Sequence, residues 1–167
     1  MTARDQDRIF EQWMEAHQGI LHKVARSYSE QPAEQEDLLQ EIRLAVWRSI
    51  RHFDGRSKPS SYIYRVALNR AISARRRTRS HRDKLDRYQH LMESTHPISA
   101  EKDDRLELVY AAIRTLNEAD RSLILLHLEG FTYEEMAETL RLSTSNVGVR
   151  LSRIKTHLTQ LMKGTAS

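Results

Sequence analysis

The sequence predicts an all-α protein made of two small helical domains joined by a flexible linker. Apolar residues recur at intervals of three and four along most of the 167 residues, and no segment has the alternating pattern of a strand. A polar stretch with a proline, residues 93–103, interrupts this pattern and separates residues 1–92 from residues 104–167. The apolar content of 39% is enough for buried cores.

Three helices are predicted in the first domain. The first carries an apolar stripe from Ile9 to Tyr28, and the second, from Leu38 to Phe53, follows carboxylates that favour a helix N-terminus. The stretch DGRSKPS, Asp54 to Ser60, combines Asp-Gly turn chemistry with a proline suited to the start of a helix. We therefore expect a third helix after this turn, continuing into the arginine-rich stretch NRAISARRRTRSHR.

Four helices are predicted in the second domain, over residues 106–116, 118–130, 132–140 and 146–161. Gly130 is placed to cap the second of these, and Thr132 with Glu135 fits a capping box at the start of the third. The segment RLSTS is a tight break before the last helix. The last two helices therefore have the layout of a helix-turn-helix.

The composition argues against several classes of protein. There is no cysteine, and the eight histidines form no pair with metal-ligand spacing, so we expect no metal and no cofactor. No set of catalytic residues and no phosphate-binding glycine loop is evident, so an enzyme is not expected. Neither a signal peptide nor a segment suited to membrane insertion is found, which makes the cytoplasm the expected location.

The positive charge is concentrated in the middle of the chain. The net charge is only +4, but residues 51–92 hold 12 lysines and arginines against 3 acidic residues. Residues 1–50 hold 6 against 9, and residues 93–167 hold 9 against 11. Such a basic segment is the usual electrostatic mark of a surface that meets nucleic acid.

The last predicted helix has the character of a DNA-reading helix. From Arg141 to Lys163 there are five lysines and arginines and no carboxylate, which suits a helix beside phosphates. Asparagine and arginine side chains also offer the paired hydrogen bonds that distinguish adenine and guanine. The candidates for base contact are Ser145, Asn146, Val149, Arg150 and Arg153. A plain helical hairpin with a solvated basic face remains the alternative.

The third helix presents a cationic face. Arg65, Asn69 and Arg76 fall on one side of it, with Tyr62 one turn earlier. Aromatic rings beside a cationic track suit unpaired DNA, because stacking tolerates any base. In the alternative interpretation, Tyr62 and Tyr64 are core residues and the arginines only solvate the surface.

The second helix mixes apolar and acidic side chains along one edge. This combination suits docking on a basic protein surface. The residues concerned are Asp37, Leu38, Gln40, Glu41, Leu44 and Trp47. The alternative is that Leu38 and Trp47 belong to the core.

Two segments resemble the sigma-70 family of bacterial sigma factors. The segment EDLLQEIRLAVWRSIRHFDGRSKPSSYIYRVALNRAISARRR is similar to region 2, and LNEADRSLILLHLEGFTYEEMAETLRLSTSNVGVRLSRIKTHL is similar to region 4. Having only these two regions and a short linker is typical of the extracytoplasmic-function (ECF) group. A region 4 helix-turn-helix also occurs in response regulators, so the first domain carries the identification.

The resemblance implies a set of partners. The first domain would bind the β′ coiled coil of core RNA polymerase through the edge of the second helix, and the second domain would contact the β flap. Promoter DNA is the second partner and an anti-sigma factor the third, and we expect the protein to be a monomer.

The resemblance also implies two roles in DNA binding. The helix from Ser145 would read the minus-thirty-five element, and the first domain would recognise and melt the minus-ten element. The minus-ten residues that the resemblance implies are Phe53, Asp54, Arg56, Lys58, Tyr62, Arg65, Asn69 and Arg76.

Five positions depart from the family pattern. Tyr62 stands where tryptophan is usual, Pro59 where phenylalanine is common and Ser73 where aspartate is frequent. Arg141 replaces a frequent turn glycine and Gly148 a frequent lysine. These departures bear on promoter preference.

Two other functions remain open from the sequence. A stand-alone helix-turn-helix regulator would bind duplex DNA without polymerase and use its first domain for dimerisation or sensing. A helical adaptor would have no DNA role at all.

Overall fold

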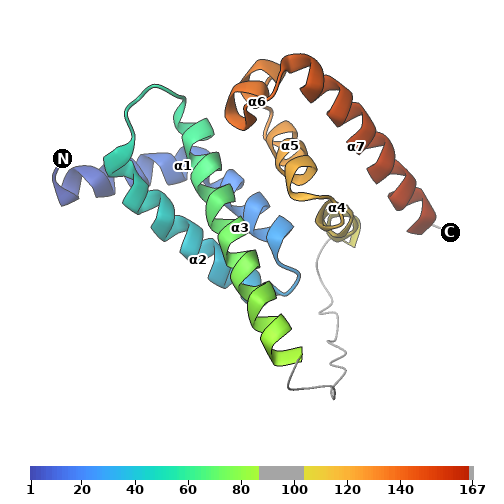
Figure 1. Ribbon diagram of the computed structural model, residues 1–167. Helices are drawn as coiled ribbons and strands as arrows, with labels where there is room; N and C mark the ends of the chain where they lie inside the picture. Colours follow the sequence, from blue (N-terminus) through green and yellow to red (C-terminus); the bar gives the residue numbers. More distant parts are fainter. Residues whose placement is uncertain (87–103, 166–167) are drawn as a thin grey trace.

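The protein is a pair of helical groups. The computed structural model describes residues 1–86 and 104–165. The first group comprises α1 (Ala3–Tyr28), α2 (Pro32–Ser49), the short 3-10 helix η1 (Ile50–His52) and α3 (Pro59–Asp86). The second comprises α4 (Asp104–Arg114), α5 (Glu118–Leu128), α6 (Tyr133–Leu140) and α7 (Thr144–Thr165). Figure 1 shows the two groups next to each other; no strand occurs in the described residues, and the all-α prediction is confirmed.

The predicted linker, residues 93–103, lies outside the described residues, and so do residues 87–92 at the end of the predicted first domain. Within the described part of the chain, no helix combines the length and the apolar character needed to cross a membrane.

Capping chemistry sets the helix boundaries. Helix α1 begins several residues before its apolar stripe because Thr2 and Asp5 form a capping box. Helix α7 begins at Thr144, two residues earlier than predicted, since the Ser143 hydroxyl accepts a hydrogen bond of 3.1 Å from the backbone N–H of Asn146. Gly130 follows α5 with a φ of +80°, as a glycine after a helix end is expected to do.

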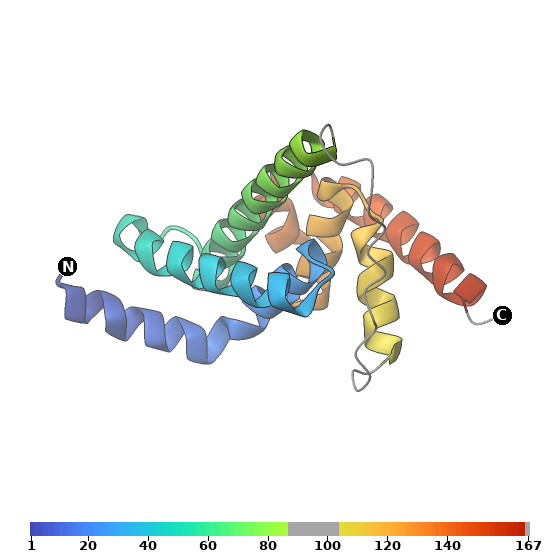
Figure 2. The same cartoon turned by 90° about the horizontal axis from the view of Figure 1, so that it is seen from below.

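Helices α1, α2 and α3 form a three-helix bundle. Figure 2 shows α1 and α2 running along each other, and α3 packs on both. Their shared interior is lined by aliphatic side chains at helical spacing, including Leu21, Val24, Ile42 and Val46, each at most 1% exposed. Burial of this stripe is what holds the three helices together.

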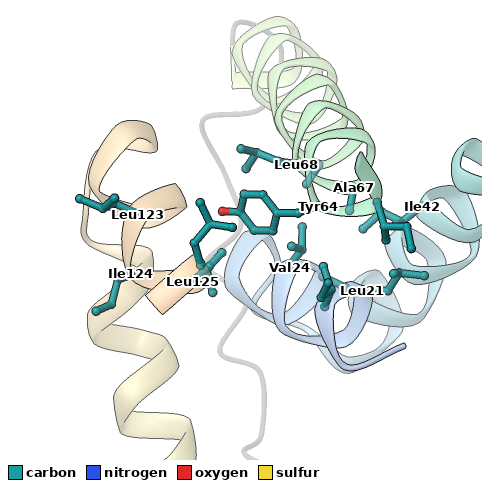
Figure 3. Close-up of a cluster of buried hydrophobic side chains, with 14 of the residues drawn as sticks. Leu21, Val24, Ile42, Tyr64, Ala67, Leu68, Leu123, Ile124 and Leu125 are labelled. Atoms are coloured by element: carbon teal, nitrogen blue, oxygen red, sulfur yellow. The ribbon is translucent and has the colours of Figure 1, made fainter. Parts of the chain in front are cut away.

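The two helical groups share one continuous buried cluster. Tyr64 on α3 is fully buried, and its hydroxyl donates a hydrogen bond of 2.6 Å to the carbonyl oxygen of Ser122 on α5. Figure 3 shows the Tyr64 ring with Leu68 above it, Val24 below it and Leu125 of α5 near its hydroxyl end. Burial raises the pKa of Tyr64 well above its ordinary value, so the hydroxyl stays a donor.

Candidate nucleic-acid interface

The loop between η1 and α3 is a compact turn. The backbone N–H of Arg56 donates to the carboxylate of Asp54 at 3.0 Å, and Gly55 has a φ of +74°, a conformation that glycine adopts without strain. Both Asp54 and Arg56 are exposed, as is Lys58. The loop therefore offers charged side chains to solvent from a backbone that is locally fixed.

An aromatic cluster anchors the start of this loop. The ring centroid of Phe53 lies 5.2 Å from that of Trp13 on α1 and 4.9 Å from that of Tyr62 on α3. The Tyr62 hydroxyl donates to the carbonyl oxygen of Ser49 at 2.9 Å. Phe53 and Tyr62 are thus half-buried and pack against the core, so stacking on an unpaired base would require these two rings to leave their present partners.

The exposed face of α3 begins directly after this cluster. Arg65, Asn69 and Arg76 are all exposed, as their helical spacing predicts. The Arg65 guanidinium donates to the Ser57 hydroxyl of the loop at 3.2 Å, which joins the loop and the helix face. Arg76 reaches toward Glu118 of α5, with 3.9 Å between their nearest charged atoms. The structure therefore brings three predicted residues into one cationic surface beside the loop.

Helices α6 and α7 form the helix-turn-helix. The predicted capping box is confirmed, because Thr132 and Glu135 bond each other reciprocally at the start of α6. Arg141 then ends α6 in the left-handed conformation, with a φ of 56°, at the position where the family often has glycine. Gly148 of α7 faces the ring of Tyr133, and a Cβ there would lie 3.5 Å from that ring. The two helices thus cross closely.

The start of α7 presents most of the predicted base-reading residues. Ser145, Asn146, Val149 and Arg153 are exposed. Arg150 differs, because Asp120 of α5 holds it: the carboxylate accepts from Nε at 3.0 Å and from Nη2 at 2.5 Å. Such a two-pronged pair fixes the guanidinium plane. Arg150 must turn away from Asp120, or use its remaining nitrogen, to reach a base.

The residues of the predicted protein-docking edge of α2 differ in how exposed they are. Asp37, Gln40 and Leu44 are exposed, and Leu44 keeps 47% of its surface accessible. Leu38, in contrast, is only 7% exposed and belongs to the core, as the alternative interpretation of its sequence position had it. Glu41 is half-buried and accepts from Arg70 at 2.8 Å and Arg77 at 2.9 Å.

Trp47 lies at the margin of the α2 edge. Its indole N–H donates to Asp7 of α1 at 2.8 Å, and its backbone carbonyl accepts from the buried Gln6 at 2.7 Å. Trp47 is therefore half-buried and joined to α1, so only part of its side chain is available to a partner.

Sequence reasoning did not identify the residues that hold these surfaces. Asp120 restrains Arg150, Glu135 pairs with Lys58, and Trp13 supports Phe53. Each partner lies at least 30 residues away in the chain, so no local pattern signals it. The one local signal, the spacing of Thr132 and Glu135, did reveal the capping box.

The two surfaces on this all-helical fold define a DNA-binding protein with a helix-turn-helix. Residues 13–81 match the family model of sigma-70 region 2, and residues 106–158 match that of sigma-70 region 4. The chain belongs to the sigma-70 family, in its extracytoplasmic-function group, and is an RNA polymerase sigma factor for promoter-specific initiation. A stand-alone regulator is not favoured, because region 2 precedes the helix-turn-helix.

Several relatives support this assignment. The ECF RNA polymerase sigma-E factor of Haemophilus influenzae is 30% identical over 131 residues, covering 71% of this chain and 69% of that protein. The ECF RNA polymerase sigma factor SigM of Mycobacterium tuberculosis is 24% identical over 157 residues, covering 92% of this chain and 76% of that protein.

Two solved structures share the fold. One is the sigma factor RpoE in complex with the anti-sigma factor NepR from Bartonella quintana, with a TM-score of 0.70 and 23% identity over 93% of this chain and 98% of that one. The other is CnrH in complex with the cytosolic domain of CnrY, with a TM-score of 0.66 and 22% identity over 95% and 90% of the two chains.

Proposed function

We propose that this sigma factor contacts its promoter through two surfaces of different kinds. The loop at Asp54, Arg56 and Lys58, with the adjoining face of α3, recognises the minus-ten element. The first turns of α7 read the minus-thirty-five element through Ser145, Asn146, Val149, Arg150 and Arg153. The observation that carries the proposal is the exposure of Arg65, Asn69 and Arg76 on one face of α3 directly after the loop.

The face of α3 assists strand opening. An extruded base costs a few kcal/mol, and contacts available only to the unpaired strand offset that cost. Arg65 supplies charge beside the loop, and the Asn69 amide supplies both a donor and an acceptor for a base edge. Phe53 and Tyr62 support the loop from beneath through their contact with each other, which is a role consistent with their partial burial.

The exposed edge of α2 docks on core RNA polymerase. Asp37, Gln40 and Leu44 combine acidic, polar and apolar surface there, which fits the β′ coiled coil, and the half-buried Glu41 and Trp47 extend the patch. Leu38 acts from beneath by fixing α2 in the bundle. The upper part of the second domain contacts the β flap.

We also propose a location, an oligomeric state and a regulator for the protein. It acts in the cytoplasm, as a monomer and not as an enzyme, with residues 1–92 and 104–167 as its two domains. An anti-sigma factor controls it. The support for that partner is that RpoE, which shares the fold, was solved in complex with the anti-sigma factor NepR.

Transcription in vitro tests the proposal. The purified protein is mixed with core polymerase on fragmented genomic DNA, and we expect promoter-specific transcripts and a complex that co-elutes. Tight duplex binding without polymerase, together with no transcripts, would instead support the stand-alone regulator.

A substitution tests the role of α3 in opening. We expect Asn69→Ala to weaken the permanganate footprint of the open complex more than it weakens the closed complex. Gln18→Ala, at an exposed position on α1, is the matched control. An unchanged footprint in the Asn69 variant would contradict the melting role.

A further inference from the structure

A second cationic region lies on α3, on a face next to the proposed promoter face. A cleft of about 600 Å³ opens there between the end of α1, the start of α2, α3 and α5. Three of its lining residues on α3, Arg75, Arg79 and Arg82, follow one another at helical spacing on a single face. No ion pair among the described residues involves any of the three.

The cleft is also lined by a buried guanidinium that has no carboxylate partner among the described residues. Arg121 of α5 is 1% exposed, and its Nη2 donates to the carbonyl oxygens of Arg114 at 2.7 Å and Leu116 at 2.9 Å. Its Cζ lies 4.7 Å from the ring centroid of Tyr28, while its Nε finds no hydrogen-bond partner in the part of the chain that the structure describes. A buried, charged donor left unpaired in this way is costly, and an acceptor in the cleft would relieve that cost.

Several guanidinium groups line this cleft together. Burial lowers the pKa of Arg121, and the positive charge of Arg75 lowers it further. Arg114, which also lines the cleft, is paired through Nη1 with Glu107, but its buried Nη2 has no hydrogen-bond partner among the described residues. The guanidinium groups of two helical groups therefore converge on one space, and a multiply charged anion is the ligand that neutralises them best.

The cleft also has acidic lining residues, just before α2 and on α2 itself. Glu30, Glu34 and Asp37 form no ion pair among the described residues, whereas Glu41 is paired with Arg70 and Arg77. Carboxylates accept hydrogen bonds from hydroxyl and amino groups. The cleft thus suits a molecule with phosphates at one end and neutral donors at the other, and its volume is that of an ordinary small-molecule site.

We propose that this cleft is a binding site for a phosphorylated nucleoside, whose phosphates pair with Arg75, Arg79, Arg114 and Arg121. The ligand would bridge α3 of the first helical group and α5 of the second. This site goes beyond promoter recognition and does not depend on it.

Calorimetric titration of the full chain with ATP, at constant ionic strength and without added divalent metal, tests the proposal. We expect one saturable site, for which inorganic tripolyphosphate competes and adenosine does not. Arg79→Gln is expected to weaken ATP binding about tenfold, the value of one charge-assisted hydrogen bond, and the matched Arg76→Gln, outside the cleft, by less than about twofold.

A second measurement avoids any substitution of the buried residue. In the ¹⁵N-labelled protein, the Nε–H resonance of Arg121 is expected to shift as ATP saturates the site. The proposal is overturned by the absence of saturable binding, by equal losses in the Arg79 and Arg76 variants, by adenosine binding as well as ATP, or by an Arg121 resonance that does not move.

Discussion

Lys58 and Glu135 form an ion pair that joins the loop between η1 and α3 to the helix-turn-helix, 77 residues further along the chain. One carboxylate oxygen of Glu135 accepts from Lys58, and the other accepts from the backbone N–H of Thr132 at 2.9 Å. The hydrogen bond from Lys58 is the largest contribution that lowers the pKa of Glu135. A single side chain therefore both caps α6 and engages a lysine proposed to contact the promoter.

Two substitutions at Glu135 separate these roles. Glu135→Gln removes the ion pair but keeps an oxygen for the Thr132 N–H, so we expect the free energy of unfolding to fall by less than about 0.5 kcal/mol, because Lys58 is 70% exposed. Glu135→Ala also removes the cap and is expected to cost about 1 kcal/mol. Urea unfolding measures both. Equal losses would show that the cap contributes nothing.

Arg150 is expected to serve sequence discrimination. Arg150→Ala should reduce the preference for a minus-thirty-five duplex over a scrambled one by about tenfold while sparing core binding, since a paired arginine–guanine contact is worth about 1–3 kcal/mol. Asp120→Asn should strengthen duplex binding, because it frees the guanidinium from its ion pair. Fluorescence anisotropy measures both. If Arg150→Ala weakened binding to the scrambled duplex as much as binding to the promoter duplex, Arg150 would contact only phosphate and would not read a base.

The left-handed residue at the end of α6 is a stability site. Arg141 has a φ of 56° and ψ of 47°, a conformation that costs an ordinary residue about 1 kcal/mol relative to glycine. We therefore expect Arg141→Gly to raise the free energy of unfolding by up to about 1 kcal/mol. Gly130→Ala, at a φ of +80°, is the reverse experiment and should lower it by a similar amount. Thermal unfolding measures both variants. If the two substitutions changed the midpoint temperature in the same direction, this account would be contradicted.

Glu107 should make the packing of the two helical groups depend on pH. It accepts from Arg114 at 2.8 Å and from Arg26 of α1 at 3.1 Å. Burial raises the pKa of Glu107, but the hydrogen bonds from the two arginines outweigh burial, so the pKa lies below the ordinary 4.5. A carboxylate with a lowered pKa stabilises the fold above pH 4.5 and loses that contribution as the pH falls through the lowered pKa.

The variant Glu107→Gln checks this dependence. At pH 7 we expect it to be less stable than the unchanged protein by about 1 kcal/mol, a value reduced for solvent screening because Glu107 is 42% exposed. The two proteins should converge in urea midpoint as the pH is lowered below 4.5. Glu138→Gln, at an exposed position without an ion pair among the described residues, is the control. A constant difference across the pH range would exclude ionisation as the cause.

Local chemistry made the helices predictable, and long-range packing did not follow from it. The stripe from Ile9 to Tyr28, the proline that begins α3 and the Thr132 capping box each act within a few residues, so each can be read from the sequence. The hydrogen bond from Tyr64 to Ser122 joins two residues that are 58 positions apart in the sequence. No local sequence pattern around either residue predicts this bond. Apolar periodicity predicts that a residue is buried, but it does not identify the helix that covers it.

The same distinction applies to the candidate site. The exposure of Asn69, Arg76 and Asn146 follows from helical spacing, and the structure agrees. The engagement of Arg150 by Asp120 and the burial of Leu38 could not be derived, because each depends on how one helix lies against another. Their roles in promoter and polymerase binding stay predictions.

The aromatic cluster at the loop also contains an intrinsic fluorophore, Trp13. Trp13 is 7% exposed, and its ring contacts Phe53, the residue that begins the loop between η1 and α3. The chain contains only one other tryptophan, Trp47, so Trp47→Phe would leave a single indole as the source of emission. Because indole emission responds to the polarity and packing around the ring, any movement of Phe53 during promoter opening would be visible in real time without an attached dye.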